Sequence, residues 1–133
     1  MSRLREKSNI NYESAQLLIE KSYFAPSVHC AYYSVFQLLK YSLSFFSGDS
    51  YDEISRKIGS DKYQGSHKYI INGILEYVRS DSREDYREIK RKLTDLKHFR
   101  EQSDYDYIDV TFDNSRKSYR FATEIREYIN NKL

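Results

Sequence analysis

Arg100 is the residue whose type and position most clearly suggest chemistry. It takes the next place in a seam of apolar residues that recur every three or four positions, as along one face of a helix. Burying a guanidinium costs several kcal/mol unless it is paired, so we expect a counter-charge, and Asp104 lies one turn further on. Alternatively, Arg100 reaches out to solvent at the end of the helix. The seam consists of Tyr86, Ile89, Leu93 and Leu96.

The segment that follows, SDYDYIDV at 103–110, crowds three Asp and two Tyr at the expected end of that helix. The helix dipole disfavours negative charge there, so the carboxylates need cations. Arg100, Lys97 or an arginine of a partner chain would supply them. The other interpretation of the segment is a solvated turn with ordinary Asp residues.

Two adjacent tyrosines lie in the most apolar part of the chain. Helical geometry puts Tyr32 on the core face and turns Tyr33 by about 100° to a different side of the helix. We therefore assign Tyr32 to the core, and Tyr33 to a cleft or an interface. The stripe that contains Tyr33 also holds His29, Phe36 and Lys40.

Histidine and cysteine are too few and too scattered for a metal site. The three His residues fall on three different expected helices, and Cys30 is the single cysteine, so no metal-ligand spacing and no internal disulfide result. We predict no metal and no cofactor. His67 stands at the expected start of a helix, where the dipole disfavours a charged imidazole. It is therefore either a neutral capping residue or a cleft residue.

A basic stripe follows the outer face of the helix that carries Arg100. Beside tyrosines, such a stripe can track the phosphates of a nucleic acid. It can equally be an ordinary solvated face, because acidic residues interrupt it and Glu88 with Lys92 forms an i,i+4 pair. The stripe consists of Arg87, Lys90, Arg91, Lys97 and His98.

The elements that would position these residues are helices. We expect an all-α fold, an antiparallel up-down four-helix bundle with an additional short helix, in a single domain over residues 1–133. Whether the polar stretch 47–65 is an ordered lid or a loose loop stays open. The expected helices run from Leu4 to Ser22, from Pro26 to a stop at Gly48, over about 51–58, from Ser66, from a Ser82–Asp85 cap, and from a cap at Asp113 or Asn114.

Composition limits the class of protein. Of the 133 residues, 39% are hydrophobic, 16% aromatic and 32% charged, which is too aromatic for disorder and too charged for a membrane protein. The net charge of +2 indicates no nucleic-acid-binding tail. The N-terminus is too polar for a signal peptide, so we expect a cytoplasmic protein that does not associate with a membrane.

In order and spacing, these segments resemble the HEPN domain family. The tandem tyrosines and an Arg-x-x-Ser-Asp-Tyr run from Arg100 to Tyr105 are similar to small stand-alone members that carry an Arg-x-x-Ala/Ser-Asp-Tyr signature. The resemblance extends over nearly the whole chain. The segments that carry it are SAQLLIEKS, YFAPSVHCAYYSVFQLL, SHKYIINGIL, LKHFREQSDYDY and FATEIREYI.

The resemblance implies a possible ribonuclease, with one departure. Many HEPN domains cleave RNA without a metal, using an Arg and a His that are separated by four to six intervening residues. Arg100 matches the Arg, but Tyr105, Asp106 and Tyr107 stand where the His would fall. Because cleavage needs a group that exchanges a proton near neutral pH, we expect a non-catalytic or vestigial protein. The alternatives are a ribonuclease toxin in which Arg100 acts with Tyr105, Asp104 or His98, and a pure protein-interaction module.

The resemblance also implies partners. HEPN domains commonly form homodimers, which would bring two copies of Arg100 and Asp104 into one cleft. Some pair with minimal nucleotidyltransferases in toxin–antitoxin modules, and Tyr107 matches the tyrosine that such enzymes adenylylate. The ligand would be a nucleotide or RNA. The expected binding residues are Tyr33, His67, Lys97, His98, Arg100 and Tyr107.

Overall fold

The computed structural model describes residues 3–60, 65–105 and 107–133, and these residues form six α-helices and no strand. The predicted all-α fold is therefore confirmed. The helices are α1 (Arg3–Glu20), α2 (Phe24–Ser47), α3 (Tyr51–Ser60), α4 (Ser66–Asp81), α5 (Arg83–Ser103) and α6 (Phe112–Lys132).

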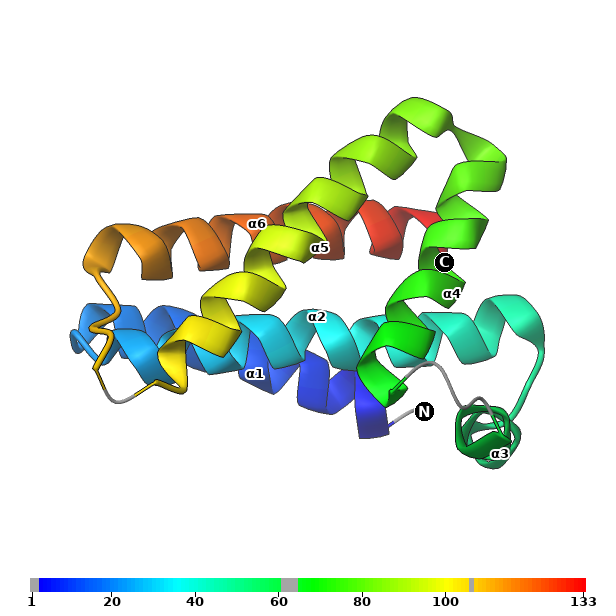
Figure 1. Cartoon of the computed structure of the whole chain (residues 1–133), viewed down its shortest axis with the longest axis horizontal. Helices are drawn as coiled ribbons and strands as arrows, with labels where there is room; N and C mark the ends of the chain where they lie inside the picture. Colours follow the sequence, from blue (N-terminus) through cyan, green and yellow to red (C-terminus); the bar gives the residue numbers. More distant parts are fainter. Residues whose placement is uncertain (1–2, 61–64, 106) are drawn as a thin grey trace.

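Helix α2 is the central element of the bundle. It packs against α1, α4, α5 and α6. Figure 1 shows α1, α2 and α6 running along the length of the molecule, while α4 and α5 form a hairpin in which α5 crosses α2 obliquely. The start of α4 and the end of α5 therefore both come to lie over α2.

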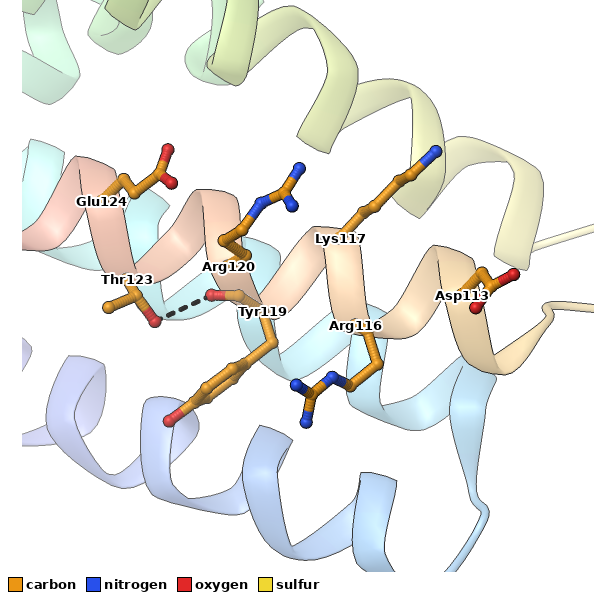
Figure 2. Close-up of a pocket in the computed structure, with 7 residues that line it drawn as sticks. All are labelled: Asp113, Arg116, Lys117, Tyr119, Arg120, Thr123 and Glu124. Carbon is orange, nitrogen blue, oxygen red and sulfur yellow. Dashed lines mark hydrogen bonds between the residues drawn. The ribbon is translucent and has the colours of Figure 1, made fainter.

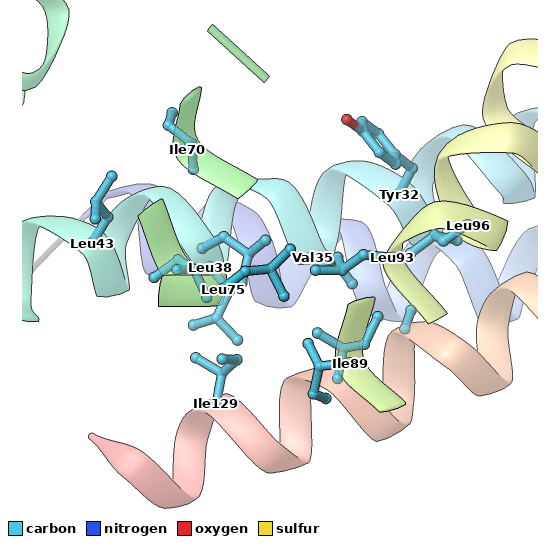
Figure 3. Packing of buried hydrophobic residues seen from close by; sticks show 14 of the residues in the cluster. Tyr32, Val35, Leu38, Leu43, Ile70, Leu75, Ile89, Leu93, Leu96 and Ile129 are labelled. Atoms are coloured by element: carbon cyan, nitrogen blue, oxygen red, sulfur yellow. The ribbon is translucent and has the colours of Figure 1, made fainter. Parts of the chain in front are cut away.

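The core forms where α2 faces the other helices. Leu39 and Ile74 are fully buried, as are Leu96 and Ile125. The burial of Leu96, together with Ile89 and Leu93, confirms the apolar seam predicted for the helix of Arg100. Figure 3 shows side chains of this cluster converging from α2, α4, α5 and α6. The short helix α3 contributes Ile54, which is 1% exposed, so the part of the polar stretch from 51 to 60 is packed; residues 61–64 lie outside the described residues.

Two of the predicted helix ends are confirmed. Gly48 ends α2 in the left-handed conformation, with φ of 76°, and its N–H donates to the Ser44 carbonyl at 3.0 Å. The Ser82 hydroxyl accepts a hydrogen bond from the Asp85 N–H at 3.2 Å and so caps α5. Because Ser82 also ends α4, the turn between these two helices is a single residue.

Two other helix starts were predicted wrongly. Helix α2 begins at Phe24, so Pro26 lies inside the first turn, where an N–H would have no intrahelical partner in any case. Helix α6 is capped by Thr111, whose hydroxyl accepts from the Asn114 N–H at 3.1 Å, rather than by Asp113 or Asn114. Thr111 belongs to the residues that are preferred at this position but ranks below Asp and Asn, so residue type alone favoured the wrong candidates.

Candidate functional site

Arg100 lies half-buried near the end of α5, with a counter-charge that it holds only weakly. Its side chain is 20% exposed, and one Nη is 3.6 Å from an Asp104 oxygen, so the predicted pairing with Asp104 is confirmed. The guanidinium carbon lies 4.9 Å from the centre of the Tyr32 ring on α2. The Nε of Arg100 is buried and has no hydrogen-bond acceptor among the described residues.

Tyr32 and His67 are joined by a short hydrogen bond between α2 and α4. The Tyr32 hydroxyl is 2.6 Å from Nδ1 of His67. Burial raises the pKa of Tyr32 to about 12, so the phenol keeps its proton. Burial lowers the pKa of His67, and the positive charges of Arg100 and Lys97 lower it further. His67 is therefore a neutral imidazole at neutral pH, able to accept a proton at one ring nitrogen.

Aromatic rings of α2 fix the position of this imidazole. The His67 ring stacks on Phe36, with 4.1 Å between ring centres and 12° between planes, and lies parallel to Tyr32 at 5.6 Å. Tyr33 meets it edge-on at 6.0 Å. We call Tyr32, Tyr33, Phe36, His67 and Arg100 the Arg100 cluster. It joins one cation and one neutral imidazole on a rigid aromatic base.

A second histidine anchors the end of α5. Nε2 of His29 on α2 is 2.8 Å from the other oxygen of Asp104, the residue at which α5 ends. Asp104 therefore divides its carboxylate between His29 and Arg100. Sequence reasoning missed the pairing of His29, because the two residues are far apart in the chain and nothing local to His29 indicates it.

The structure sorts the other predicted site residues into two places. Tyr105 and Tyr107 follow α5 and are 51% and 83% exposed, with their ring centres 5.8 Å apart. Lys97 and His98 line a groove of about 410 Å³ between α4 and α5. Asp106, the remaining position where the family's histidine was sought, lies outside the described residues.

Another hollow, of about 580 Å³, lies along α6. In Figure 2, Arg116 and Tyr119 point to one side of that helix, whereas Lys117, Arg120 and Glu124 point to the other. Its charged side chains therefore diverge, and its cations share the hollow with Asp113 and Glu124. This arrangement is less suited to gripping one ligand than the Arg100 cluster.

The described residues offer neither a metal-binding cluster nor a membrane-spanning helix. In the described part of the chain, no group of three or more His, Cys, Asp and Glu side chains is arranged to hold a metal ion. Within residues 3–60, 65–105 and 107–133, no helix is long and apolar enough to cross a membrane.

Comparison with known proteins gives one match. The family model of the HEPN domain matches residues 1–132 of the chain. No curated protein and no solved structure matches it.

Proposed function

Because this chain belongs to the HEPN domain family, whose roles are nucleotide- or RNA-related or of ribonuclease type, we propose that it binds the phosphate of a nucleotide or of RNA at the Arg100 cluster. In this proposal the chain is a non-catalytic, vestigial member of the family. The phosphate of the ligand contacts the guanidinium of Arg100, and the ring edges of Tyr33 and His67 lie beside the phosphate.

The buried Nε of Arg100 is the observation that carries this proposal. A buried donor without an acceptor costs about 1–3 kcal/mol, and the Asp104 contact at 3.6 Å leaves the guanidinium without a close bidentate partner. A phosphate would first contact the Nη groups of the partly exposed guanidinium. A shift of the Arg100 side chain that uncovers Nε would then let the phosphate accept from Nε and a neighbouring Nη at once, which is the geometry that arginine favours with phosphate. Asp104 can give up its contact with Arg100, because its other oxygen keeps the contact with His29.

Binding measurements on an Arg100→Ala variant test the proposal. The ligands are UMP, followed by calorimetry, and a fluorescent oligouridylate of about ten nucleotides, followed by anisotropy. The variant loses charge-assisted hydrogen bonds to one phosphate, so its affinity for each ligand should fall by about 10- to 100-fold.

Arg79→Ala is the matched control. Arg79 also lies over a tyrosine ring, that of Tyr86 at 5.7 Å, and also has a loose carboxylate partner, Glu76 at 3.7 Å. Its side chain, however, is 55% exposed at the other end of α4. If the Arg100 and Arg79 variants bind both ligands equally well, the proposed site is wrong.

A specific observation favours a second candidate function, metal-independent cleavage of RNA. The imidazole that is missing after Arg100 in the sequence is supplied by His67, from another helix. When Nδ1 of His67 donates to the Tyr32 oxygen, Nε2 is free to take the proton of a 2′-hydroxyl. The 2′-oxygen would then bond to phosphorus, the bond to the 5′-oxygen would break, and that oxygen would take a proton from water, with Arg100 stabilising the added negative charge. This assigns the proton transfer to His67 in place of Tyr105, Asp104 or His98.

An RNA incubation in the presence of EDTA separates binding from cleavage. Cleavage would yield a 2′,3′-cyclic phosphate and a 5′-hydroxyl, and both His67→Gln and Arg100→Ala should abolish it. Intact RNA after incubation with the parent protein supports the non-catalytic proposal. Cleavage that survives His67→Gln would exclude this assignment of the proton carrier.

We further propose a homodimer and a minimal nucleotidyltransferase partner that modifies Tyr107. HEPN domains often dimerise, and the exposed rings of Tyr105 and Tyr107 offer aromatic surface to a partner. Tyr107 is 83% exposed, so an enzyme can reach its hydroxyl. Light scattering measures the oligomeric state. Intact mass after co-expression with such an enzyme should rise by one adenylyl group, and Tyr107→Phe should prevent the rise.

A further inference from the structure

We infer that the groove between α4 and α5 binds the neighbouring nucleotides of a single-stranded RNA whose phosphate occupies the Arg100 cluster. This inference rests on the proposed function and extends it from one nucleotide to a strand. We call the groove lined by Lys68, Lys90, Lys97 and His98, with Ile71 and Leu93 among its apolar residues, the α4–α5 groove.

The groove lies next to the Arg100 cluster along both helices. On α4, Lys68 follows His67; on α5, Lys97 lies one turn before Arg100. Lys97 is close enough to His67 to lower the pKa of that imidazole. A ligand that leaves the Arg100 cluster between these two helices therefore enters the groove without crossing another element.

The rim of the groove is positively charged and available to a ligand. Lys68, Lys90 and Lys97 form no ion pair with a carboxylate of the described residues, in contrast to Arg91, which is shared between Glu88 and Asp95. Glu101 is the acidic residue among those that line the groove. Charge complementarity thus favours a polyanion.

The length and lining of the groove favour a strand over a mononucleotide. Lys90 and Arg100 are separated by ten positions on one helix, which is about 15 Å along its axis. A single phosphate cannot contact both ends. Between the cations, the side chains of Ile71, Leu75 and Leu93 offer apolar surface, and the hydroxyl of Thr94 and the amide of Asn72 lie beside them. Bases can lie against such a surface while the phosphates face the lysines.

The experiment compares two double variants that remove the same charge. Lys68→Gln with Lys90→Gln alters the groove and leaves every residue of the Arg100 cluster in place. Lys7→Gln with Lys21→Gln, called the α1 variant, alters one exposed lysine on α1 and one directly after that helix. Affinity for UMP and for an oligouridylate of about ten nucleotides is measured over a range of salt concentrations.

The groove variant should bind the oligouridylate about ten-fold more weakly than the α1 variant at low salt. Its slope of log K against log salt should be smaller by about 1.4, which corresponds to two lost phosphate contacts. Its affinity for UMP should equal that of the parent.

Each other outcome has a distinct meaning. If both double variants bind the oligouridylate alike, or if the parent binds the oligouridylate no better than UMP, the groove is not part of the site, while the proposed function stands as long as Arg100→Ala weakens UMP. If Arg100→Ala leaves UMP binding unchanged, the proposed function itself fails. If the parent binds neither ligand, both proposals fall.

Discussion

Two arginines of this protein, one buried and one partly buried, lie over tyrosine rings, yet their surroundings suit them to opposite roles. The guanidinium carbon of Arg126 on α6 lies 4.6 Å from the ring centre of Tyr12, much as that of Arg100 lies 4.9 Å from Tyr32. Arg126 is only 8% exposed, donates to the hydroxyl of Ser8, and reaches the Asn9 amide oxygen at 2.8 Å. Its hydrogen-bonding groups are committed to α1.

The contrast shows how satisfied and unsatisfied hydrogen bonds separate structure from function. Ser8 accepts from Arg126 and donates to the Ser34 carbonyl of α2 at 2.5 Å, so one buried hydroxyl ties α1, α2 and α6 together. Nothing comparable holds Arg100, whose Nε lacks an acceptor among the described residues. A cation with its donors filled stabilises a fold; one with a donor left over is suited to a ligand.

Arg126→Ala should have the largest effect on the free energy of unfolding. It removes two charge-assisted hydrogen bonds from a buried junction, each worth about 1.5–3 kcal/mol, and opens a cavity. We expect a loss of about 2–4 kcal/mol by urea denaturation, with unchanged affinity for UMP while the variant remains folded. A stable variant would show that the two arginines differ less than their contacts indicate.

Arg100→Ala should show the opposite pattern. The lost stacking on Tyr32 costs about 0.5–1 kcal/mol, and the lost contact with Asp104 adds to that cost. Removing an unsatisfied buried donor returns about 1–3 kcal/mol. The free energy of unfolding should therefore change by less than about 1 kcal/mol while ligand affinity falls by about ten-fold or more. If Arg100→Ala unfolds the protein instead, Arg100 has a structural role like that of Arg126.

Tyr32→Phe should have a smaller effect and sharpens the comparison within the Arg100 cluster. It keeps the ring beneath the guanidinium and removes only the hydroxyl that bonds Nδ1 of His67. We expect a loss of about 1 kcal/mol in the free energy of unfolding. Tyr12→Phe serves as the control. Tyr12 lies beneath Arg126 as Tyr32 lies beneath Arg100, and the change removes the 2.6 Å contact between the Tyr12 hydroxyl and Thr123. Nuclear magnetic resonance of the His67 ring would report the change directly.

The smallest effect should be a pH dependence of stability that belongs to His67. Its pKa is lowered below the usual 6.5 by burial first, then by Arg100 and Lys97. The unfolded chain therefore binds a proton more readily than the folded chain, and stability falls as pH drops below about 6.5. In His67→Gln this part of the fall should be absent. Thermal unfolding between about pH 7.5 and 5, a range that spans the ordinary pKa of histidine, measures it, and equal pH dependence in both proteins would contradict it.

Much of the bundle could be predicted from the sequence because helix periodicity and capping are local. The apolar face through Leu39 and the Ser82–Asp85 cap each follow from residues within one or two turns. Helix starts at Pro26 and Asp113 were misplaced because several residues near each start satisfy the same local preference.

The candidate site was predictable only in part, because it is assembled across helices. Arg100 stood out as a cation in an apolar seam, and Asp104 as its neighbour one turn away. The approach of His67 to Tyr32, 35 positions apart in the chain, depends on how α4 is placed against α2. Sequence reasoning therefore looked for a histidine after Arg100, whereas the histidine of the Arg100 cluster, His67, comes from α4.

The one-residue turn at Ser82 joins α4 and α5 closely at one end of their hairpin, so the two helices act as two long arms that meet at that joint. His67 and Arg100 stand at the opposite, open end, about 24 Å away along the helices. At that distance a change of one degree in the angle between the arms shifts their tips by about 0.4 Å. Small motions at the joint are thus magnified at the end where the imidazole and the guanidinium both contact Tyr32, and a ligand held between them would stiffen the whole hairpin.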